Sequence, residues 1–255
     1  MKALSLFSGI GGIDLAAEWA GIESVAFCER EPFCQRVLQK HWPDVPIFDD
    51  VTTLTKERLE ADGIDSRAID VIFSGDPCQP YSGAGKRKGS EDDRFLWPEV
   101  NRLIDEVKPR WIVRENVAGN ITLGLDGVLS DLEDRSYSTA TIVLPAIAVG
   151  AEHERYRVFV LANSSGKSRL QANKAINTIR EKWNAWEINC RSDRRSVPRV
   201  DWGISGPPVS GDINGIPNRL DRCRALGNAV VPQQIYPILA AIKMIDDEMH
   251  STIGS

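Results

Sequence analysis

Long apolar runs and paired cysteines are both missing from this chain of 255 residues. No apolar stretch approaches the roughly 18 residues that a membrane-spanning helix needs, and the N-terminus has neither the basic region nor the cleavage site of a signal peptide. No two cysteines form a Cys-x-x-Cys pair, which argues against a zinc site. We therefore expect a cytoplasmic protein with free thiols and with neither a metal nor a membrane partner. The cysteines are Cys28, Cys34, Cys78, Cys190 and Cys223.

Positive charge is also scarce, because 36 acidic residues outweigh 31 Lys and Arg and leave a net charge of −5. This deficit is unevenly distributed. Between residues 163 and 202, nine Lys and Arg stand against four acids, which gives this segment a net charge of about +5 and the remainder about −10. A basic patch on an acidic body fits contact with phosphates, and a solvated basic loop explains the same composition equally well.

The first 160 residues alternate short apolar runs with amphipathic segments. We predict strands at residues 3–8, 24–28, 46–51, 68–74, 110–113, 138–144 and 157–162, and helices at 13–20, 32–41, 95–107, 127–134 and 233–249. This order predicts an α/β fold with a mostly parallel sheet, helices on both faces, and ligands beyond the carboxyl ends of the strands. Residues 164–215 break the pattern and predict a small insert, which divides the chain into 1–163, 164–215 and 216–255.

Three features at predicted strand ends suggest a nucleoside ligand. The first strand runs into Phe-Ser-Gly-Ile-Gly-Gly at residues 7–12, where glycines let the backbone approach a ligand closely. A dinucleotide fingerprint would need glycine in place of Asp14, so a nicotinamide site fits poorly. Glu29 ends the second strand, where a carboxylate can accept hydrogen bonds from ribose hydroxyls. Asp50 ends the third, where it could bind an adenine amino group.

A cysteine between two prolines follows the fourth predicted strand, in Gly-Asp-Pro-Cys-Gln-Pro-Tyr-Ser at residues 75–82. The prolines stiffen the turn. A thiol on a rigid, polar loop at a strand end is placed as a nucleophile, so Cys78 is the candidate. Its pKa would have to be depressed, which nearby arginines could achieve.

With four further motifs, this loop resembles the DNA (cytosine-5)-methyltransferases of bacteria and phages. Pro-Cys-Gln at residues 77–79 is similar to the catalytic motif of that family, and residues 7–12 are similar to its cofactor motif. Glu-Asn-Val at 115–117, the paired arginines of His-Glu-Arg-Tyr-Arg at 153–157 and Gly-Asn-Ala-Val at 227–230 follow in the order of the family. The resemblance covers most of the chain except 164–215. It implies the Rossmann-like class I fold of S-adenosylmethionine-dependent methyltransferases.

The resemblance also implies roles for single residues. Cys78 would add to C6 of a cytosine flipped out of the duplex, and Glu115 would contact N3 and the exocyclic amine. Arg155 would contact the cytosine O2, and Arg157 would support the loop and the charge of the site. S-adenosylmethionine would donate the methyl group and leave as S-adenosylhomocysteine. The implied cofactor-binding residues are Phe7, Ser8, Gly9, Gly11, Gly12, Glu29, Arg30, Asp50, Val51, Asp76, Pro77, Leu96, Asn228 and Val230. The implied DNA-binding residues are Gln79, Ser82, Lys86, Arg87, Lys88, Arg194 and Arg195.

Three positions depart from the pattern of the family. Asp76 stands where an aromatic residue usually precedes Pro-Cys, His153 where glutamine is usual, and Arg30 where an aromatic often stacks on adenine. The insert at 164–215 would be a target-recognition domain, and its shortness suggests a short target sequence in double-stranded DNA. The resemblance implies a monomer in the cytoplasm of a bacterium or of a phage-infected host, with or without a cognate restriction endonuclease.

Three other functions stay open at this point. An amino-methyltransferase would need neither the cysteine nor Glu-Asn-Val. Methylation of cytosine in RNA would use the same chemistry, and the sequence separates it poorly from methylation of DNA. A catalytically silent DNA-binding homologue would have no need of Cys78, Glu115 or Arg155.

Overall fold

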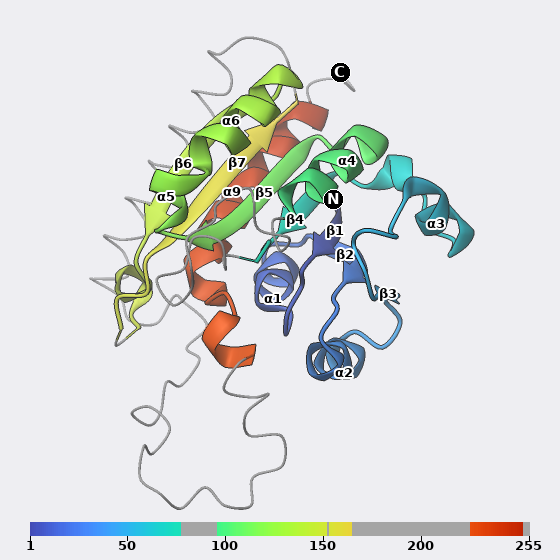
Figure 1. Cartoon of the computed structure of the whole chain (residues 1–255), viewed down its shortest axis with the longest axis horizontal. Coiled ribbons are helices and arrows are strands. Elements are labelled where there is room, and N and C mark those ends of the chain that lie inside the picture. The colour runs from blue at the N-terminus through green and yellow to red at the C-terminus, as the bar shows by residue number, and fades with distance from the viewer. Residues whose placement is uncertain (78–95, 152, 165–224, 252–255) are drawn as a thin grey trace, which may run out of the picture.

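The computed structural model describes residues 1–77, 96–151, 153–164 and 225–251. Within them, seven strands form one sheet in the order β3-β2-β1-β4-β5-β7-β6 (Figure 1). All neighbouring strands are parallel except at β7, which runs antiparallel to both β5 and β6. The predicted fold, a mostly parallel Rossmann-like sheet, is therefore confirmed. The strands are β1 (Lys2–Leu6), β2 (Glu23–Cys28), β3 (Ile47–Phe48), β4 (Val71–Ser74), β5 (Trp111–Val117), β6 (Ser138–Leu144) and β7 (Arg157–Asn163).

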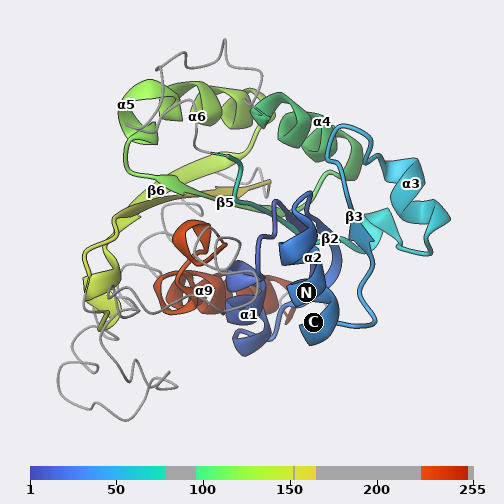
Figure 2. The same cartoon turned by 60° about the horizontal axis from the view of Figure 1, so that its bottom comes forward.

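Helices cover both faces of the sheet (Figure 2). On one face, α1 (Gly12–Trp19) packs against α9 (Pro232–Ser251), and both bury apolar side chains against the strands. The other face is covered by α3 (Lys56–Ala61), α4 (Trp97–Val107) and α6 (Leu125–Asp134). The remaining helices are α2 (Pro32–His41), the short α5 (Asn120–Leu123), and the 3-10 turns η1 (Ser66–Ala68) and η4 (Ala146–Val149).

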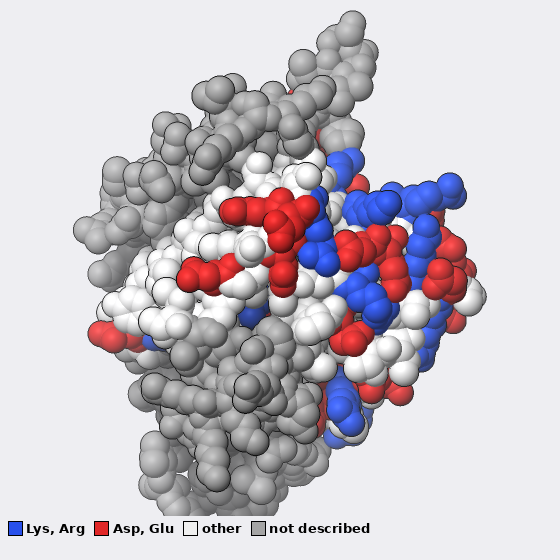
Figure 3. Space-filling view, turned by 45° about the horizontal axis from the view of Figure 1, so that its top comes forward, with Lys and Arg blue, Asp and Glu red and all other residues white. Residues whose placement is uncertain are grey.

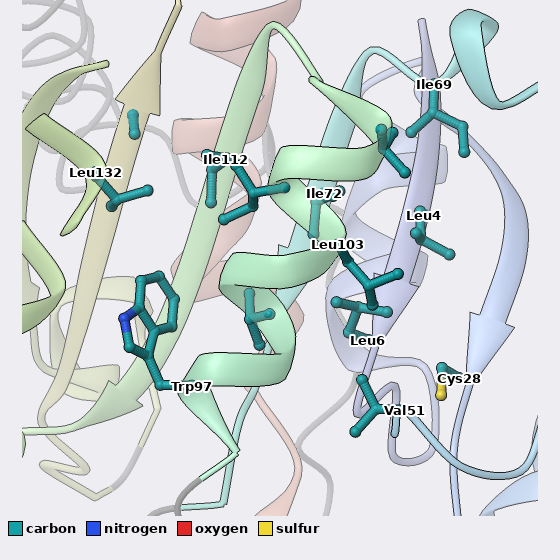
Figure 4. Close-up of a cluster of buried hydrophobic side chains, with 14 of the residues drawn as sticks. Leu4, Leu6, Cys28, Val51, Ile69, Ile72, Trp97, Leu103, Ile112 and Leu132 are labelled. Carbon is teal, nitrogen blue, oxygen red and sulfur yellow. The ribbon is translucent and has the colours of Figure 1, made fainter. Parts of the chain in front are cut away.

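The two cores follow from the period-two alternation of the strands. In β1, Leu4 and Leu6 point to the core beneath α4, whereas Ala3 points to the core beneath α1 and α9. The same alternation separates Ile72 from Val71 in β4. Figure 4 shows the α4 side, where side chains from the central strands meet those of the helix. Among the described residues, no helix combines the length and the apolar composition that crossing a membrane requires.

One difference from the sequence-based prediction matters for the site. The fifth strand was expected to end at residue 113, but β5 continues to Val117. It does so because β7 pairs with it along its whole length, from Trp111 opposite Asn163 to Val117 opposite Arg157. Glu115 is therefore held inside a strand and does not lie on a loop beyond it.

Other boundaries differ less. The third strand has only two residues, since β2 pairs with Ile47 and Phe48 alone. The helix α3 was not predicted, although the Thr55 hydroxyl caps it by accepting a hydrogen bond from the Arg58 backbone N–H. Apart from Ser164, the predicted insert at 164–215 lies outside the described residues, so the division into domains stays a prediction.

Candidate active site

The carboxyl ends of the parallel strands meet at one edge of the sheet, and predicted site residues follow them directly. The register places Leu6, the last residue of β1, beside both Cys28 of β2 and Ser74 of β4. Phe7 and Glu29, the next residues after β1 and β2, therefore lie at this edge. It is the edge at which ligands bind in sheets of this kind.

The loop after β1 takes conformations that favour glycine. Gly9 and Gly11 have φ angles of +57° and +81°. Gly12 makes a close approach, because a Cβ atom on it would lie 2.5 Å from the backbone oxygen of Val230. The loop and Val230 were both predicted to bind cofactor, and the fold brings them together from opposite ends of the chain.

Glu29 holds this loop from the neighbouring strand. Its carboxylate accepts hydrogen bonds from the backbone N–H groups of Gly9 and Glu31, each at 2.7 Å. The side chain is buried, and this burial raises the pKa of Glu29 above its ordinary value, against the effect of these hydrogen bonds. Each carboxylate oxygen retains a second lone pair for a hydroxyl donor.

Phe7, Val51 and Leu96 belong to or pack against one apolar cluster, and a second carboxylate, that of Asp50, follows β3. Phe7 and Leu96 pack against the core that contains the buried Val51. Asp50 lies two residues beyond the end of β3 and accepts hydrogen bonds from the backbone N–H and the hydroxyl of Thr52. These bonds lower its pKa, so Asp50 is an ionised acceptor. Of the other predicted cofactor residues, Arg30 and Asn228 are exposed.

Asp14 has a structural role that sequence reasoning missed. It is buried in α1, where it accepts hydrogen bonds from the hydroxyls of Ser5 in β1 and Ser24 in β2, at 3.0 and 2.7 Å. Burial raises its pKa to about 6. The clue in the sequence was the pair of serines inside otherwise apolar strands. Asp14 thus joins the first strand, helix and second strand beneath the glycine loop.

Glu115 and Arg157 form the centre of the candidate site. The Arg157 Nε atom lies 2.7 Å from Glu115 Oε1, but the contact is an ion pair without hydrogen-bond alignment, and Oε1 is buried. Burial raises the pKa of Glu115 to about 7, in opposition to the charges of Arg157 and Arg155. A carboxyl group of this kind exchanges a proton near neutral pH.

Arg155 is engaged elsewhere. Its Nη2 atom donates to the backbone oxygens of Gly227 and Ala229, at 2.9 and 2.6 Å, and its φ angle is +33°. The side-chain amide of Gln234 donates to the backbone oxygens of Leu144 and Arg155. The C-terminal segment is thereby fastened to the loop before β7. Arg157 is thus the arginine that the fold pairs with Glu115, and the contact of Arg155 with cytosine O2 stays a prediction.

Asp76 and Arg114 form a buried ion pair, and Arg114 immediately precedes Glu115 in β5. The guanidinium donates through Nε and Nη2 to the two carboxylate oxygens, at 2.7 and 2.6 Å. Neither side chain is more than slightly exposed. From the sequence, Asp76 was a departure from a motif and an implied cofactor-binding residue, and its partner Arg114 could not be identified. The cofactor contact of Asp76 stays a prediction.

Several predicted residues lie outside the described part of the chain, which ends at Pro77 before the first gap. They are Cys78, Gln79, Ser82, Lys86, Arg87, Lys88, Arg194 and Arg195. The nucleophile and the DNA contacts therefore remain predictions. Cys28 and Cys34, the two cysteines among the described residues, are buried. Burial, with the charge of Glu29, raises the pKa of Cys28 to about 12, which makes it a poor nucleophile.

Comparison with known proteins extends these observations. Residues 1–197 match the family model of the C-5 cytosine-specific DNA methylases. Type II methyltransferase M.AquIA of Picosynechococcus sp. is 34% identical over 182 residues, which cover 66% of this chain and 73% of that protein. Type II methyltransferase M.CviJI of Paramecium bursaria Chlorella virus IL3A is 32% identical over 198 residues, covering 76% of this chain and 52% of that protein.

Solved structures show the same fold. A protein encoded within an E. coli prophage, described as a DNA modification methyltransferase, has a TM-score of 0.54 and 27% identity, covering 64% of this chain and 46% of its own. The S. pombe Dnmt2 methyltransferase has a TM-score of 0.55 and 22% identity, covering 66% and 52%. At that identity the likeness speaks for the fold alone. Matches to M.CviJI and to both structures span only about half the length of those proteins.

Proposed function

The chain belongs to the C-5 cytosine-specific DNA methylase family, and we propose that it transfers a methyl group from S-adenosylmethionine to C5 of a cytosine in double-stranded DNA. The observation that carries the proposal is the ion pair between the buried Glu115 and the partly buried Arg157, at the carboxyl edge of the sheet. A pKa near 7 suits a group that must grip a cytosine through N3 and the exocyclic amine. Pro-Cys-Gln, at residues 77–79, follows Asp76 directly in the chain.

The residues at this edge fit an adenosyl cofactor. The Glu29 carboxylate can accept from ribose hydroxyls while it holds the glycine loop. The partly buried Phe7 and Leu96 offer apolar surface for adenine, with Val51 in the core behind them, and the ionised Asp50 offers an acceptor for its amino group. When bound, S-adenosylmethionine supplies an electrophilic methyl group.

The chemistry requires a thiolate and an acid that act together. The Cys78 thiolate forms a bond to C6, and negative charge then accumulates on the ring towards N3, where protonated Glu115 can neutralise it. This makes C5 nucleophilic, so that C5 would form a carbon–carbon bond to the methyl group of S-adenosylmethionine as the sulfur–methyl bond breaks and S-adenosylhomocysteine leaves. Loss of the C5 proton to a base then restores the C5–C6 double bond and expels Cys78.

Access to the base requires contacts that the duplex alone cannot provide. Because C6 is buried inside stacked DNA, the target cytosine has to be flipped out of the helix. We assign the contacts with phosphates to residues 82–88 and the choice of sequence to the basic insert at 164–215.

Methyl transfer from tritium-labelled S-adenosylmethionine to unmodified DNA, with RNA in parallel and bisulfite sequencing of the product, tests the proposal. We expect label in DNA and protected cytosines in a shared sequence context. Cys78→Ala should abolish transfer, and the control Cys34→Ala should retain it. Label only in RNA, or no label in the presence of bound DNA and cofactor, would overturn the proposal.

A further inference from the structure

The Asp76–Arg114 ion pair joins the two strand ends that bear the proposed catalytic groups. Asp76 follows β4 and lies two residues before Cys78 in the chain. Arg114 lies in β5, immediately before Glu115. The register aligns Ser74 with Arg114, so a side chain just beyond β4 can reach across to β5.

Both oxygens of the Asp76 carboxylate accept hydrogen bonds from residues of β4 and β5. Oδ1 accepts from Arg114 Nε at 2.7 Å and from the Ser74 hydroxyl at 3.2 Å. Oδ2 accepts from Arg114 Nη2 at 2.6 Å and from the Asn116 side-chain amide at 3.3 Å, and the same amide donates to the Asp76 backbone oxygen. Four donors match the capacity of a carboxylate. Asp76 is therefore a positioning group with no lone pair left for substrate.

Arg114 also contacts two residues, Asn120 and Trp97, that follow positions 78–95 in the chain. Its third nitrogen, Nη1, donates to the side-chain oxygen of Asn120 in α5, at 2.8 Å. Its guanidinium carbon lies 5.2 Å from the ring centre of Trp97. Trp97 opens α4, so one guanidinium touches residues on both sides of positions 78–95 in the chain.

Two buried charges at one place call for an explanation, because taking charges out of water is costly unless they are paired. The family usually has an aromatic residue at position 76, and an aromatic would fill this space without any charge. An Arg and an Asp with a bidentate contact give a fixed distance and angle that apolar packing does not impose.

We propose that the Asp76–Arg114 pair is a positioning device that fixes the start of the Cys78 segment against Glu115 during methyl transfer. This inference rests on the proposed function. The bidentate contact fixes the position of Asp76 relative to β5, and the charges of the pair affect the pKa of Glu115.

The charges around Glu115 give the inference a distinctive signature. Arg157 in β7, Arg155 before β7 and Arg114 in β5 lower the pKa of Glu115, and Asp76 beyond β4 raises it. Removal of the Asp76 charge should therefore lower the pKa of Glu115, and removal of the Arg114 charge should raise it. A loss of packing alone would not displace the pKa in opposite directions.

The test is the single-turnover rate of methyl transfer against pH, at saturating S-adenosylmethionine and DNA, for Asp76→Asn, Arg114→Met and the double variant. Each single change should slow transfer about 10²-fold, since a misplacement of about 1 Å can have that effect. The basic limb of the pH profile is the fall in rate as Glu115 ionises. It should move to lower pH in Asp76→Asn and to higher pH in Arg114→Met. The double variant should be no slower than the slower single variant, because both changes remove the same contact.

Two further variants distinguish the effect of the Arg114 charge from that of its bidentate contact with Asp76. Arg114→Lys keeps the charge but loses the bidentate fork, so it should lose rate without displacing the pH limb. Asp131→Asn is the matched control, because Asp131 accepts from the Trp97 indole without touching Arg114, and we expect the rate of the wild type. Thermal unfolding of each variant verifies that it folds.

Three outcomes would overturn the inference. An active wild type with unchanged single variants, single variants whose pH limbs move in the same direction, or a double variant slower than both singles would each contradict a positioning pair. If the wild type itself fails to methylate DNA, the proposed function fails first, and the inference falls with it.

Discussion

Glu115 is buried beside Arg157, and its pKa of about 7 makes its protonation state sensitive to pH near neutrality. Because the pKa is raised, the carboxyl group is protonated below about pH 7 and ionised above it. If the protonated form stabilises negative charge at N3, kcat/KM for DNA should fall as the pH rises through about 7. In Glu115→Gln this fall should disappear, and the rate should drop by about 10²–10⁴-fold, the usual contribution of an acid or base. The same basic limb in wild type and Glu115→Gln would assign it to another group.

Gly12 and Gly127 offer a matched pair of substitutions. A Cβ atom at Gly12 would lie 2.5 Å from the Val230 backbone oxygen, whereas nothing lies within 4 Å of one at Gly127 in α6. Gly12→Ala should push the C-terminal segment away, lower stability by about 1–3 kcal/mol and weaken cofactor binding. Gly127→Ala should raise stability by about 0.5–1 kcal/mol, since alanine favours a helix. Urea unfolding and cofactor titration measure both effects, and equal stability of the two variants would contradict the close approach.

Asp14 joins the elements β1, α1 and β2, and the stability that it contributes to the fold should depend on pH. Burial raises the pKa of Asp14 from 3.8 to about 6, so the folded state binds its proton more tightly than the unfolded state. The resulting stability is fully present below about pH 4 and is lost as the pH rises through about 6, by roughly 3 kcal/mol at most.

Asp14→Asn removes this titration while leaving a polar side chain for Ser5 and Ser24. The difference in unfolding free energy between wild type and variant should therefore change between pH 4 and 6, in favour of the variant at higher pH. Chemical unfolding across this range measures that difference. A difference that is independent of pH would show that Asp14 has an ordinary pKa.

The sequence predicts a strand well where the pattern of the strand's own residues is enough to identify it. The apolar run of β4 and the alternation in β6 are local signals, and both strands lie at or near their predicted positions. The end of β5 is not local, because Arg114 to Asn116 become strand residues only where β7 supplies their partners. For the same reason the sequence could identify Glu115 as a candidate but not its pairing with Arg157.

Buried polar residues were the main omission. The sequence does not reveal the partners of Asp14 and Asp76, because only the fold brings Ser5, Ser24 and Arg114 to them. Contacts between residues far apart in the chain cannot be read from spacing along it. The motifs themselves were recognisable because glycine, cysteine and paired arginine are needed in a particular order.

Across the protein as a whole, the described body and the basic insert differ in charge. Figure 3 shows acidic and basic side chains interleaved over one face of the described part. Several charged side chains of the described part form ion pairs, such as Arg135 with Asp105 and Arg58 with Asp49. The excess of positive charge lies between residues 163 and 202. We therefore expect the affinity for DNA to depend mainly on that segment.

The affinity for DNA should fall as the salt concentration rises. Each phosphate contact contributes about 0.9 to the slope of log affinity against log salt concentration. Arg194→Gln with Arg195→Gln should reduce the slope by about 2, if each arginine meets one phosphate. Arg135→Gln, which removes a charge already paired in the body, should leave the slope unchanged. Equal slopes for the double variant and wild type would place the DNA contacts elsewhere.

The most direct test of the account is whether Cys78 forms a bond to cytosine. A DNA duplex in which 5-fluorocytosine replaces cytosine permits addition and methyl transfer but carries no proton at C5 to lose, so the enzyme cannot be expelled. With S-adenosylmethionine present, we predict a protein–DNA adduct that survives denaturation and maps to Cys78, and none with Cys78→Ala. Methylation of ordinary DNA with no such adduct, or an adduct at another residue, would contradict the central claim.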